Sequence, residues 1–260
     1  MNAPRLSARN ISVSYRGTDV LRNFNIDIPE GKITTLIGPN GCGKSTLLKS
    51  LATLLPYSGE IEIDGEDIAQ LKRMDRAKRL AMLPQHPTAP DALTVSQLVA
   101  RGRHPHQSWA QRWSEEDERQ VNNALDITGI TEFADRPLAE LSGGQRQRVW
   151  IAMTLAQDTP TIFLDEPTTY LDLAHSIDIL KLVTQLRKEN AKTVVMVLHD
   201  LNLAIRYSDH MAAMTSQGTL WAEGAPADII SPELLHEVFG LTALVVEDPA
   251  TGGPLVVPTL

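Results

Sequence analysis

A glycine-rich segment constrains the fold of this chain more than any other feature. Residues 38–45 read Gly-Pro-Asn-Gly-Cys-Gly-Lys-Ser and fit the pattern G-x-x-x-x-G-K-[ST]. Residues 33–37 predict a buried strand that ends in this segment, and residues 44–55 predict a helix after it. Glycines at such a junction let backbone N–H groups curl around phosphate oxygens, and the helix N-terminus adds partial positive charge. The segment therefore predicts a phosphate-binding loop in an α/β fold.

The side chains at the end of this loop can hold a nucleotide and its metal ion. The pattern assigns Lys44 to the β- and γ-phosphates and Ser45 to Mg²⁺. An accidental glycine-rich turn is the alternative, and the flanking strand and helix argue against it. The predicted phosphate-binding residues are Gly38, Pro39, Asn40, Gly41, Cys42, Gly43, Lys44, Ser45 and Thr46.

Short strand-like and helix-like segments alternate along the chain, which favours an α/β fold around a mostly parallel sheet. Residues 161–164 and 193–198 predict further buried strands of that sheet. Near the N-terminus, residues 24–28 alternate between apolar and polar, and residues 60–63 repeat the pattern. We expect these segments to form an antiparallel β layer beside the main sheet.

The middle of the chain has a different character. Strand-like runs disappear, and prolines separate helical segments such as 94–101 and 115–128. This pattern predicts a helical lobe inserted into the α/β core. The predicted organisation is one domain over residues 1–260, with a core at 1–86 and 148–240, a helical subdomain at 87–147 and a C-terminal appendage at 241–260.

Composition excludes several classes of protein. The net charge of −8 argues against a nucleic-acid partner, which usually meets a basic face. Cys42 is the single cysteine, so no internal disulfide can form. No apolar run reaches the roughly 18 residues that a membrane span needs, and none at the N-terminus has the length typical of a signal peptide. Any role at a membrane is therefore expected to depend on a partner subunit.

Two acidic residues follow the apolar run at 162–164. A strand that ends in Asp165-Glu166 delivers both carboxylates to the C-terminal edge of the sheet, where α/β folds bind ligands. Asp165 can hold Mg²⁺, directly or through water, and Glu166 can orient or deprotonate an attacking water. A plain polar exit from a strand is the alternative, and without the glycine-rich loop it would be the better one.

The segment Leu141-Ser142-Gly143-Gly144-Gln145 resembles the signature of the ATP-binding cassette (ABC) family, and the resemblance covers nearly the whole chain. In that family the signature binds the γ-phosphate held by the opposite protomer. The residue types suit that role, because Ser142 can cap a helix and the glycines permit close backbone approach. The resemblance implies an ATPase with a P-loop cassette fold that works as a head-to-tail homodimer, with Ser142, Gly143, Gly144 and Gln145 at the nucleotide.

Other positions match the family's pattern. Gln85 resembles the glutamine that contacts Mg²⁺ or the water, and His199 resembles the histidine that touches the γ-phosphate. Asp172 resembles the aspartate at the dimer seam, and Tyr15 resembles the aromatic residue that stacks on adenine. Each has a plainer alternative: a solvated Gln85, a satisfied polar His199, or a Tyr15 in the core of an edge strand.

The stretches at 100–106, 147–153 and 169–175 resemble the ATPases of ferric-siderophore importers, whose relatives include haem and cobalamin importers. This resemblance implies an ATP-hydrolysing importer subunit at the cytoplasmic face of the inner membrane. Its implied partners are two permease subunits and, indirectly, a substrate-binding protein. The alternatives are a soluble ABC ATPase or a regulatory subunit not engaged in transport, but the chain has neither tandem cassettes nor a long coiled coil.

Three further features depart from the family or suggest other chemistry. Cys42 stands where many members carry serine, and its place beside a helix N-terminus suggests a lowered thiol pKa and sensitivity to alkylation. Tyr170 replaces a commoner small residue. His104 and His106 are spaced like metal ligands, but no nearby carboxylate or cysteine completes a site, so we expect surface residues.

Overall fold

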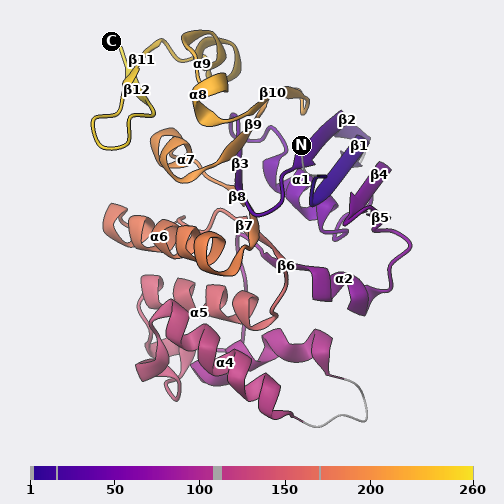
Figure 1. Ribbon diagram of the computed structural model, residues 1–260, viewed down its shortest axis with the longest axis vertical. Coiled ribbons are helices and arrows are strands. Elements are labelled where there is room, and N and C mark those ends of the chain that lie inside the picture. Colours follow the sequence, from indigo (N-terminus) through magenta and orange to yellow (C-terminus); the bar gives the residue numbers. More distant parts are fainter. Residues whose placement is uncertain (1–2, 16, 108–112, 170, 260) are drawn as a thin grey trace. The chain divides into compact units, whose positions relative to one another are not determined.

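The computed structural model describes residues 3–15, 17–107, 113–169 and 171–259 (Figure 1). The chain divides into two compact units. The first unit joins residues 1–70 to 193–260, and the second contains residues 71–192. The prediction for Tyr170 lies outside the described residues.

An antiparallel layer begins the first unit, as predicted. Its strands lie in the order β2-β1-β4-β5 and appear as neighbouring arrows in Figure 1. The alternation at 24–28 puts Phe24, Ile26 and Ile28 on a buried face, each at most 1% exposed. The strands are β1 (Leu6–Tyr15), β2 (Thr18–Ile28), β4 (Ser58–Ile63) and β5 (Glu66–Asp67).

Parallel strands form the centre of the first unit. Strand β3 (Ile33–Ile37) pairs in parallel with β8 (Thr193–Val197) on one side and with β9 (His210–Met214) on the other. Every residue of β3 and β8 is buried, as in parallel sheets covered on both faces. Strand β10 (Leu220–Gly224) pairs antiparallel with β9. The predicted buried strands at 33–37 and 193–198 are therefore confirmed.

The described residues of the first unit contain the helices α1 (Lys44–Leu51), α7 (Leu201–Tyr207), α8 (Pro226–Ile229) and α9 (Pro232–Phe239). Helix α1 is shorter than the predicted 44–55. The helix ends at Leu51, and the dihedral angles of Ala52 are no longer helical. Thr53 then has a φ of 58°, in the left-handed region, so a right-handed helix cannot continue through it.

The predicted appendage contains a β-hairpin that the sequence did not reveal. Strands β11 (Ala243–Glu247) and β12 (Pro254–Pro258) pair antiparallel. The side-chain amide of Asn202, on α7, both donates to and accepts from the backbone of Val256. Arg206, one turn further along α7, donates to the Asp248 carboxylate at 2.6 Å. These contacts attach the hairpin to α7.

The second unit combines one pair of parallel strands with helices. Strand β6 (Leu80–Leu83) pairs with β7 (Thr161–Asp165), which confirms the predicted strand at 161–164. Helices α4 and α5 lie side by side (Figure 1). The helices are α2 (Arg73–Arg79), α3 (Val95–Ala100), α4 (Glu115–Thr128), α5 (Gly143–Ala156) and α6 (Leu173–Asn190), with short 3₁₀ turns η1 (Arg101–His106), η2 (Thr131–Phe133) and η3 (Leu138–Glu140).

Side-chain caps explain where two helices of the second unit, α3 and α4, begin. The side chains of Thr94 and Ser114 each accept the backbone N–H of the residue three positions further on. The side chain of that residue in turn accepts the backbone N–H of Thr94 or Ser114. Such capping boxes satisfy N–H groups that a helix start leaves unpaired. The predicted helix at 115–128 matches α4, whereas 94–101 begins and ends one residue outside α3. None of the helices in the described part of the chain combines the length and apolar character that a bilayer crossing requires.

A buried ion pair ties α4 to the 3₁₀ turn η1. The Arg103 guanidinium donates to Asp117 at 2.9 Å and to the carbonyl of Ala156 at 2.8 Å. Both charged side chains are almost fully buried. Burial opposes the charge on Asp117, but hydrogen bonds from Arg103 and Ser114 outweigh it and lower the pKa of the carboxyl. The pair therefore stays ionised inside the second unit.

Replacing Arg103 with alanine is expected to destabilise the protein strongly, because it leaves the Asp117 carboxylate buried without its cation. Removing one partner of a buried pair costs about 3–5 kcal/mol. Urea unfolding followed by circular dichroism measures the loss. Arg119→Ala is the control, since its ion pair with Glu116 is exposed, and we expect a change below about 1 kcal/mol. Equal losses in the two variants would contradict this account.

Candidate functional site

The glycine-rich loop has the predicted strand before it and the predicted helix after it. Strand β3 ends at Ile37 and α1 begins at Lys44. Gly38, Gly41 and Gly43 all have positive φ, at 149°, 78° and 102°. At Gly38 a side chain would also collide, since a Cβ would lie 2.5 Å from the carbonyl oxygen of Met214. These glycines permit a backbone curl that residues with a Cβ rarely adopt.

Helix α1 begins without a side-chain cap. Its N-cap is Gly43, which has no side chain to accept the first N–H groups. Ser142, Asp172 and Asp200, at the starts of α5, α6 and α7, each accept a backbone N–H of their own helix. The first N–H groups of α1 therefore have no capping side chain to bind, and the positive end of the helix dipole favours an anion there.

Lys44 is buried inside this loop, only 5% exposed. Its ammonium donates to the carbonyl oxygens of Gly38 at 2.8 Å and Pro39 at 2.9 Å. A buried ammonium is tolerated only when it is paired or hydrogen-bonded. The loop thus holds a positive charge beside the backbone N–H groups that would contact phosphate.

The Cys42 thiol does not behave as the sequence suggested. It is 2% exposed and packs under the loop. Burial raises the pKa of the thiol, and the nearby Lys44 charge only partly offsets that effect. The hypothesis of a lowered pKa is therefore wrong, because loss of hydration outweighs the helix N-terminus and the lysine.

Two more predicted residues lie in the first unit. His199 follows β8 and is exposed, directly before Asp200, which caps α7 by accepting the backbone N–H of Leu203 at 2.8 Å. Tyr15 ends β1 and is 45% exposed, so the alternative that it fills the core of an edge strand is wrong. Its ring is accessible for stacking.

The predicted carboxylates lie at the end of β7 in the second unit. Asp165 is the last residue of the strand and is 1% exposed, and Glu166 follows it at 8%. Glu166 has a φ of 55°, an uncommon conformation that costs energy for a residue with a long side chain. The Thr169 hydroxyl donates to its carboxylate at 2.9 Å. The sequence patterns did not predict this role for Thr169. Its hydroxyl, three residues after Glu166, was the feature of the sequence that could have indicated it.

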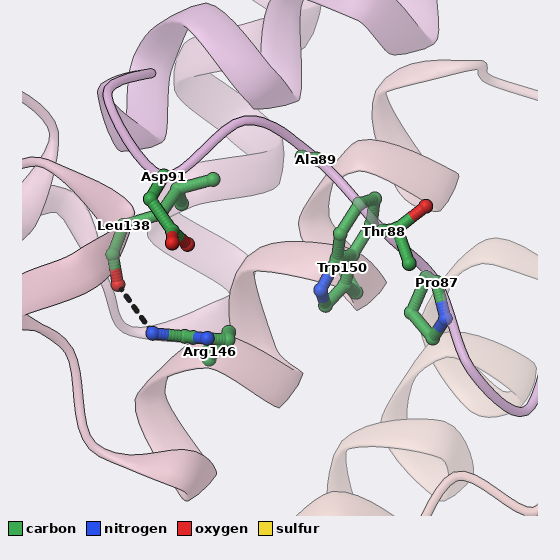
Figure 2. A pocket seen from close by; sticks show the side chains of 7 residues that line it. All are labelled: Pro87, Thr88, Ala89, Asp91, Leu138, Arg146 and Trp150. Atoms are coloured by element: carbon green, nitrogen blue, oxygen red, sulfur yellow. Dashed lines mark hydrogen bonds between the residues drawn. The ribbon is translucent and has the colours of Figure 1, made fainter.

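Gln85 lies two residues beyond the end of β6 and is half-buried. Close to it in sequence, a cavity of about 230 Å³ opens in the second unit. Figure 2 shows Arg146 and Trp150 of α5 facing the segment 87–91 across it, with Arg146 bonded to the carbonyl of Leu138. Its lining is Pro87, Thr88, Ala89, Asp91, Leu138, Arg146 and Trp150.

The signature segment forms the start of α5. Ser142 is the N-cap, and its hydroxyl accepts the backbone N–H of Gln145, whose side chain accepts the N–H of Ser142 in return. The predicted cap by Ser142 is thus confirmed. A hydroxyl that accepts one hydrogen bond still has its O–H to donate. Ser142 and Gly143 are exposed, so that donor is accessible.

Asp172 caps α6 in the same unit. Its carboxylate accepts both the backbone N–H and the ring Nδ1 of His175, each at 2.8 Å. These hydrogen bonds lower the pKa of Asp172 and keep it ionised. Gln147, on α5, donates to the carbonyl of Pro167 at 2.8 Å, which connects α5 to the segment leading to Asp172.

The histidines at 104 and 106 differ in environment. The ring Nε2 of His106 lies 2.7 Å from the carbonyl of Gln157, whereas His104 is exposed. Over the residues that the structure describes, no three histidine, cysteine or acidic side chains gather as metal ligands. His106 therefore has a structural partner within the second unit.

Cys42 is expected to resist alkylation in the folded protein, because the thiolate is the reactive form and burial disfavours it. N-ethylmaleimide followed by mass spectrometry is expected to label unfolded protein fully at pH 7 while the native protein stays unlabelled. Since Cys42 is the single cysteine, one mass shift reports it. Rapid native labelling that ATP slows would instead show an accessible, ionised thiol.

Comparison with known proteins agrees with this arrangement. The family described as ABC transporter matches residues 21–169. The achromobactin transport ATP-binding protein CbrD of Dickeya dadantii (strain 3937) is 52% identical over 97% of this chain and 94% of its own. The ferric enterobactin transport ATP-binding protein FepC of Escherichia coli (strain K12) is 47% identical over 98% of this chain and 94% of its own.

A solved structure gives the same result for the fold. A dimeric ATP-binding cassette in a post-hydrolysis state, bound to ADP and Pi, superposes with a TM-score of 0.74 at 29% identity, over 85% of this chain and 98% of the other. The P-loop cassette fold expected from the sequence is confirmed. Sequence and fold together show that this chain belongs to the ABC transporter family, as one of its ATP-binding cassettes.

Proposed function

We propose that this protein is the ATP-hydrolysing subunit of an importer for iron–siderophore chelates. The observation that carries the proposal is its similarity, over nearly its whole length, to ATP-binding proteins named for achromobactin and ferric enterobactin transport. Every nucleotide-binding residue expected from the family pattern is also present in this chain.

ATP binds through the glycine-rich loop. Backbone N–H groups of the loop, which Pro39 lacks, and of the start of α1 up to Thr46 bind the phosphates, and the Lys44 ammonium turns from the loop carbonyls to the β- and γ-phosphate oxygens. The exposed ring of Tyr15 stacks on the adenine. His199 hydrogen-bonds the γ-phosphate.

Mg²⁺ fits the oxygen donors of this chain. Ser45 offers a hydroxyl, Gln85 an amide oxygen and Asp165 a carboxylate, and Mg²⁺ prefers hard oxygen ligands together with phosphates. These three residues would hold the ion, directly or through water, and it would supply positive charge to the phosphate oxygens.

Glu166 orients the attacking water and accepts its proton. Its unusual backbone conformation and the hydrogen bond from Thr169 restrict the direction of the carboxylate. Such restriction suits a general base, which must hold one geometry relative to the phosphorus. Thr169 is a positioning residue for this step.

Two copies act together, head to tail. The signature residues Ser142, Gly143, Gly144 and Gln145 of one copy contact the γ-phosphate held by the other, and Asp172, at the seam between the copies, also lies at that nucleotide. The exposure of Ser142, Gly143 and Asp172 supports this assignment, as does the dimeric cassette with the same fold. ATP closes the pair, and loss of the γ-phosphate opens it.

Two permease subunits receive the motion at the cytoplasmic face of the inner membrane, and a substrate-binding protein delivers the chelate to them. We assign their docking to the Gln85 region and to a helical subdomain at 87–147. The cavity beside segment 87–91 supports this assignment, because it combines an aromatic wall with Asp91 and Arg146. A peripheral attachment through permeases requires no span in this chain.

Iron uptake tests the proposed function. A deletion strain is expected to lose uptake of radiolabelled ferric siderophores and to recover it with the wild-type gene but not with Glu166→Gln. A panel of catecholate, hydroxamate and carboxylate chelates identifies the cargo. Normal uptake of all of them in the deletion strain, or co-purification with ribosomes or DNA rather than with permeases, would overturn the proposal.

The purified Glu166→Gln variant is expected to bind ATP, lose turnover by at least about a hundredfold and accumulate as an ATP-bound dimer. Neutralising the base stops hydrolysis but leaves phosphate binding intact. Size-exclusion chromatography with Mg-ATP and phosphate release measure both effects. The control Glu132→Gln alters an exposed carboxylate of the same unit and is expected to behave as wild type. Wild-type turnover in Glu166→Gln would mean that another group is the base.

Filling the cavity at 87–91 is expected to uncouple the subunit from its permeases. Thr88→Trp places a bulky ring on the cavity wall, so transport and permease-stimulated ATPase fall by about tenfold or more, while the isolated chain still binds ATP. Pull-down with the permeases measures the lost contact. Asn122→Trp, on the exposed face of α4, is the matched control. Wild-type transport with Thr88→Trp would exclude this cavity as the docking surface.

A further inference from the structure

His175 lies between two helix starts to which the proposed function assigns nucleotide contacts. It is the third residue of α6, and its backbone N–H already satisfies the Asp172 cap. The ring adds a second bond, with Nδ1 2.8 Å from the same carboxylate oxygen. An ionised carboxylate only accepts hydrogen bonds, so Nδ1 carries the proton. That bond fixes the tautomer and the orientation of the ring.

The opposite edge of the ring meets α5. A Cβ added at Gly144 would lie 2.9 Å from Cδ2 and 3.4 Å from Nε2 of His175. The neighbouring Gly143 is different, because a Cβ there would meet nothing within 4 Å. Gly144 has an ordinary helical φ, so its own backbone conformation does not require glycine. Within this chain, the imidazole is what leaves no room for a side chain at position 144.

A second connection supports the link between these helix starts. Gln147, one turn along α5 from Gly144, donates to the carbonyl of Pro167 at 2.8 Å. Pro167 is thus hydrogen-bonded to α5. Beyond Asp172, the His175 ring lies against α5 at Gly144. The ring connects the Asp172 carboxylate to the signature glycine.

We infer that His175 is a positioning residue of the signature site, which holds the start of α5 in register with Asp172 through one imidazole. The inference rests on the proposed function, in which Ser142, Gly144 and Asp172 act at the nucleotide of a second copy. It assigns His175 no contact with ATP. It also explains from contacts within the chain why position 144 needs a glycine, in addition to the close approach of a phosphate.

A cycle of substitutions in the full-length chain tests the contact without relying on activity. Gly144→Ala is expected to lower the Tm by on the order of 5 °C in wild type, because the new methyl group collides with the ring. In a His175→Ala background the same substitution is expected to leave the Tm unchanged or to raise it. Gly143→Ala is the matched control and is expected to shift the Tm equally in both backgrounds. Equal shifts for Gly144→Ala in the two backgrounds would overturn the inference.

Turnover separates positioning from simple packing. His175→Ala is expected to lower kcat about tenfold or more, with the KM for ATP changed less than about twofold. His175→Phe keeps a ring beside Gly144 but cannot bond Asp172, and we expect the same loss of kcat. Wild-type kcat with phenylalanine would reduce His175 to a packing residue and overturn the inference. If the variants show the expected coupling of Tm shifts but the wild-type chain hydrolyses no ATP, the proposed function is refuted instead.

Discussion

The backbone curl between β3 and α1 is the constraint on which the rest of the structure depends. Its glycines take positive φ values, so the chain folds back tightly enough for two of its own carbonyls to hold the Lys44 ammonium. The same curl leaves the start of α1 without a capping side chain. The Lys44 ammonium and the positive end of the α1 dipole thus belong to one loop, and that combination favours an anionic ligand.

The starts of α5 and α6 provide further polar groups, but unlike the start of α1 they have side-chain caps. Ser142 and Asp172 are occupied caps, fixed by backbone N–H groups of their own helices. Both side chains can still bind a further group while they cap their helices, because the Ser142 hydroxyl keeps its proton to donate and the Asp172 carboxylate keeps further lone pairs. The second unit therefore presents groups fixed by hydrogen bonds of its own helices, whereas the loop of the first unit presents backbone N–H groups and the Lys44 ammonium.

Sequence patterns anticipated the elements whose residues repeat with a clear period. Alternation located the strands around Phe24 and Ile61, the apolar runs at 162–164 and 194–198 located β7 and β8, and the segment before the glycine-rich loop located β3. The hairpin of β11 and β12 was not anticipated, because Val245-Val246 and Val256-Val257 are doubled apolar pairs without alternation.

The sequence predicted which residue types belong to the candidate site, but not the burial and contacts of their side chains. Motifs identified Lys44, Glu166 and Ser142, yet the thiol pKa of Cys42 depends on burial that no motif encodes. The contacts of Thr169 and His175 were also hidden, because each depends on side-chain orientations at a local turn. The roles assigned to the motif residues remain proposals, and the predicted division at residues 87–147 stays a prediction.

The attachment of the C-terminal hairpin has a practical consequence. Asn202 and Arg206 connect β12 and Asp248 to α7, and α7 begins two residues after His199. Anything fused behind Thr259 is therefore mechanically joined, through one short helix, to the residue assigned to the γ-phosphate. An affinity handle or fluorescent reporter at that end could disturb His199 through α7, so the opposite terminus is the better place for a purification tag.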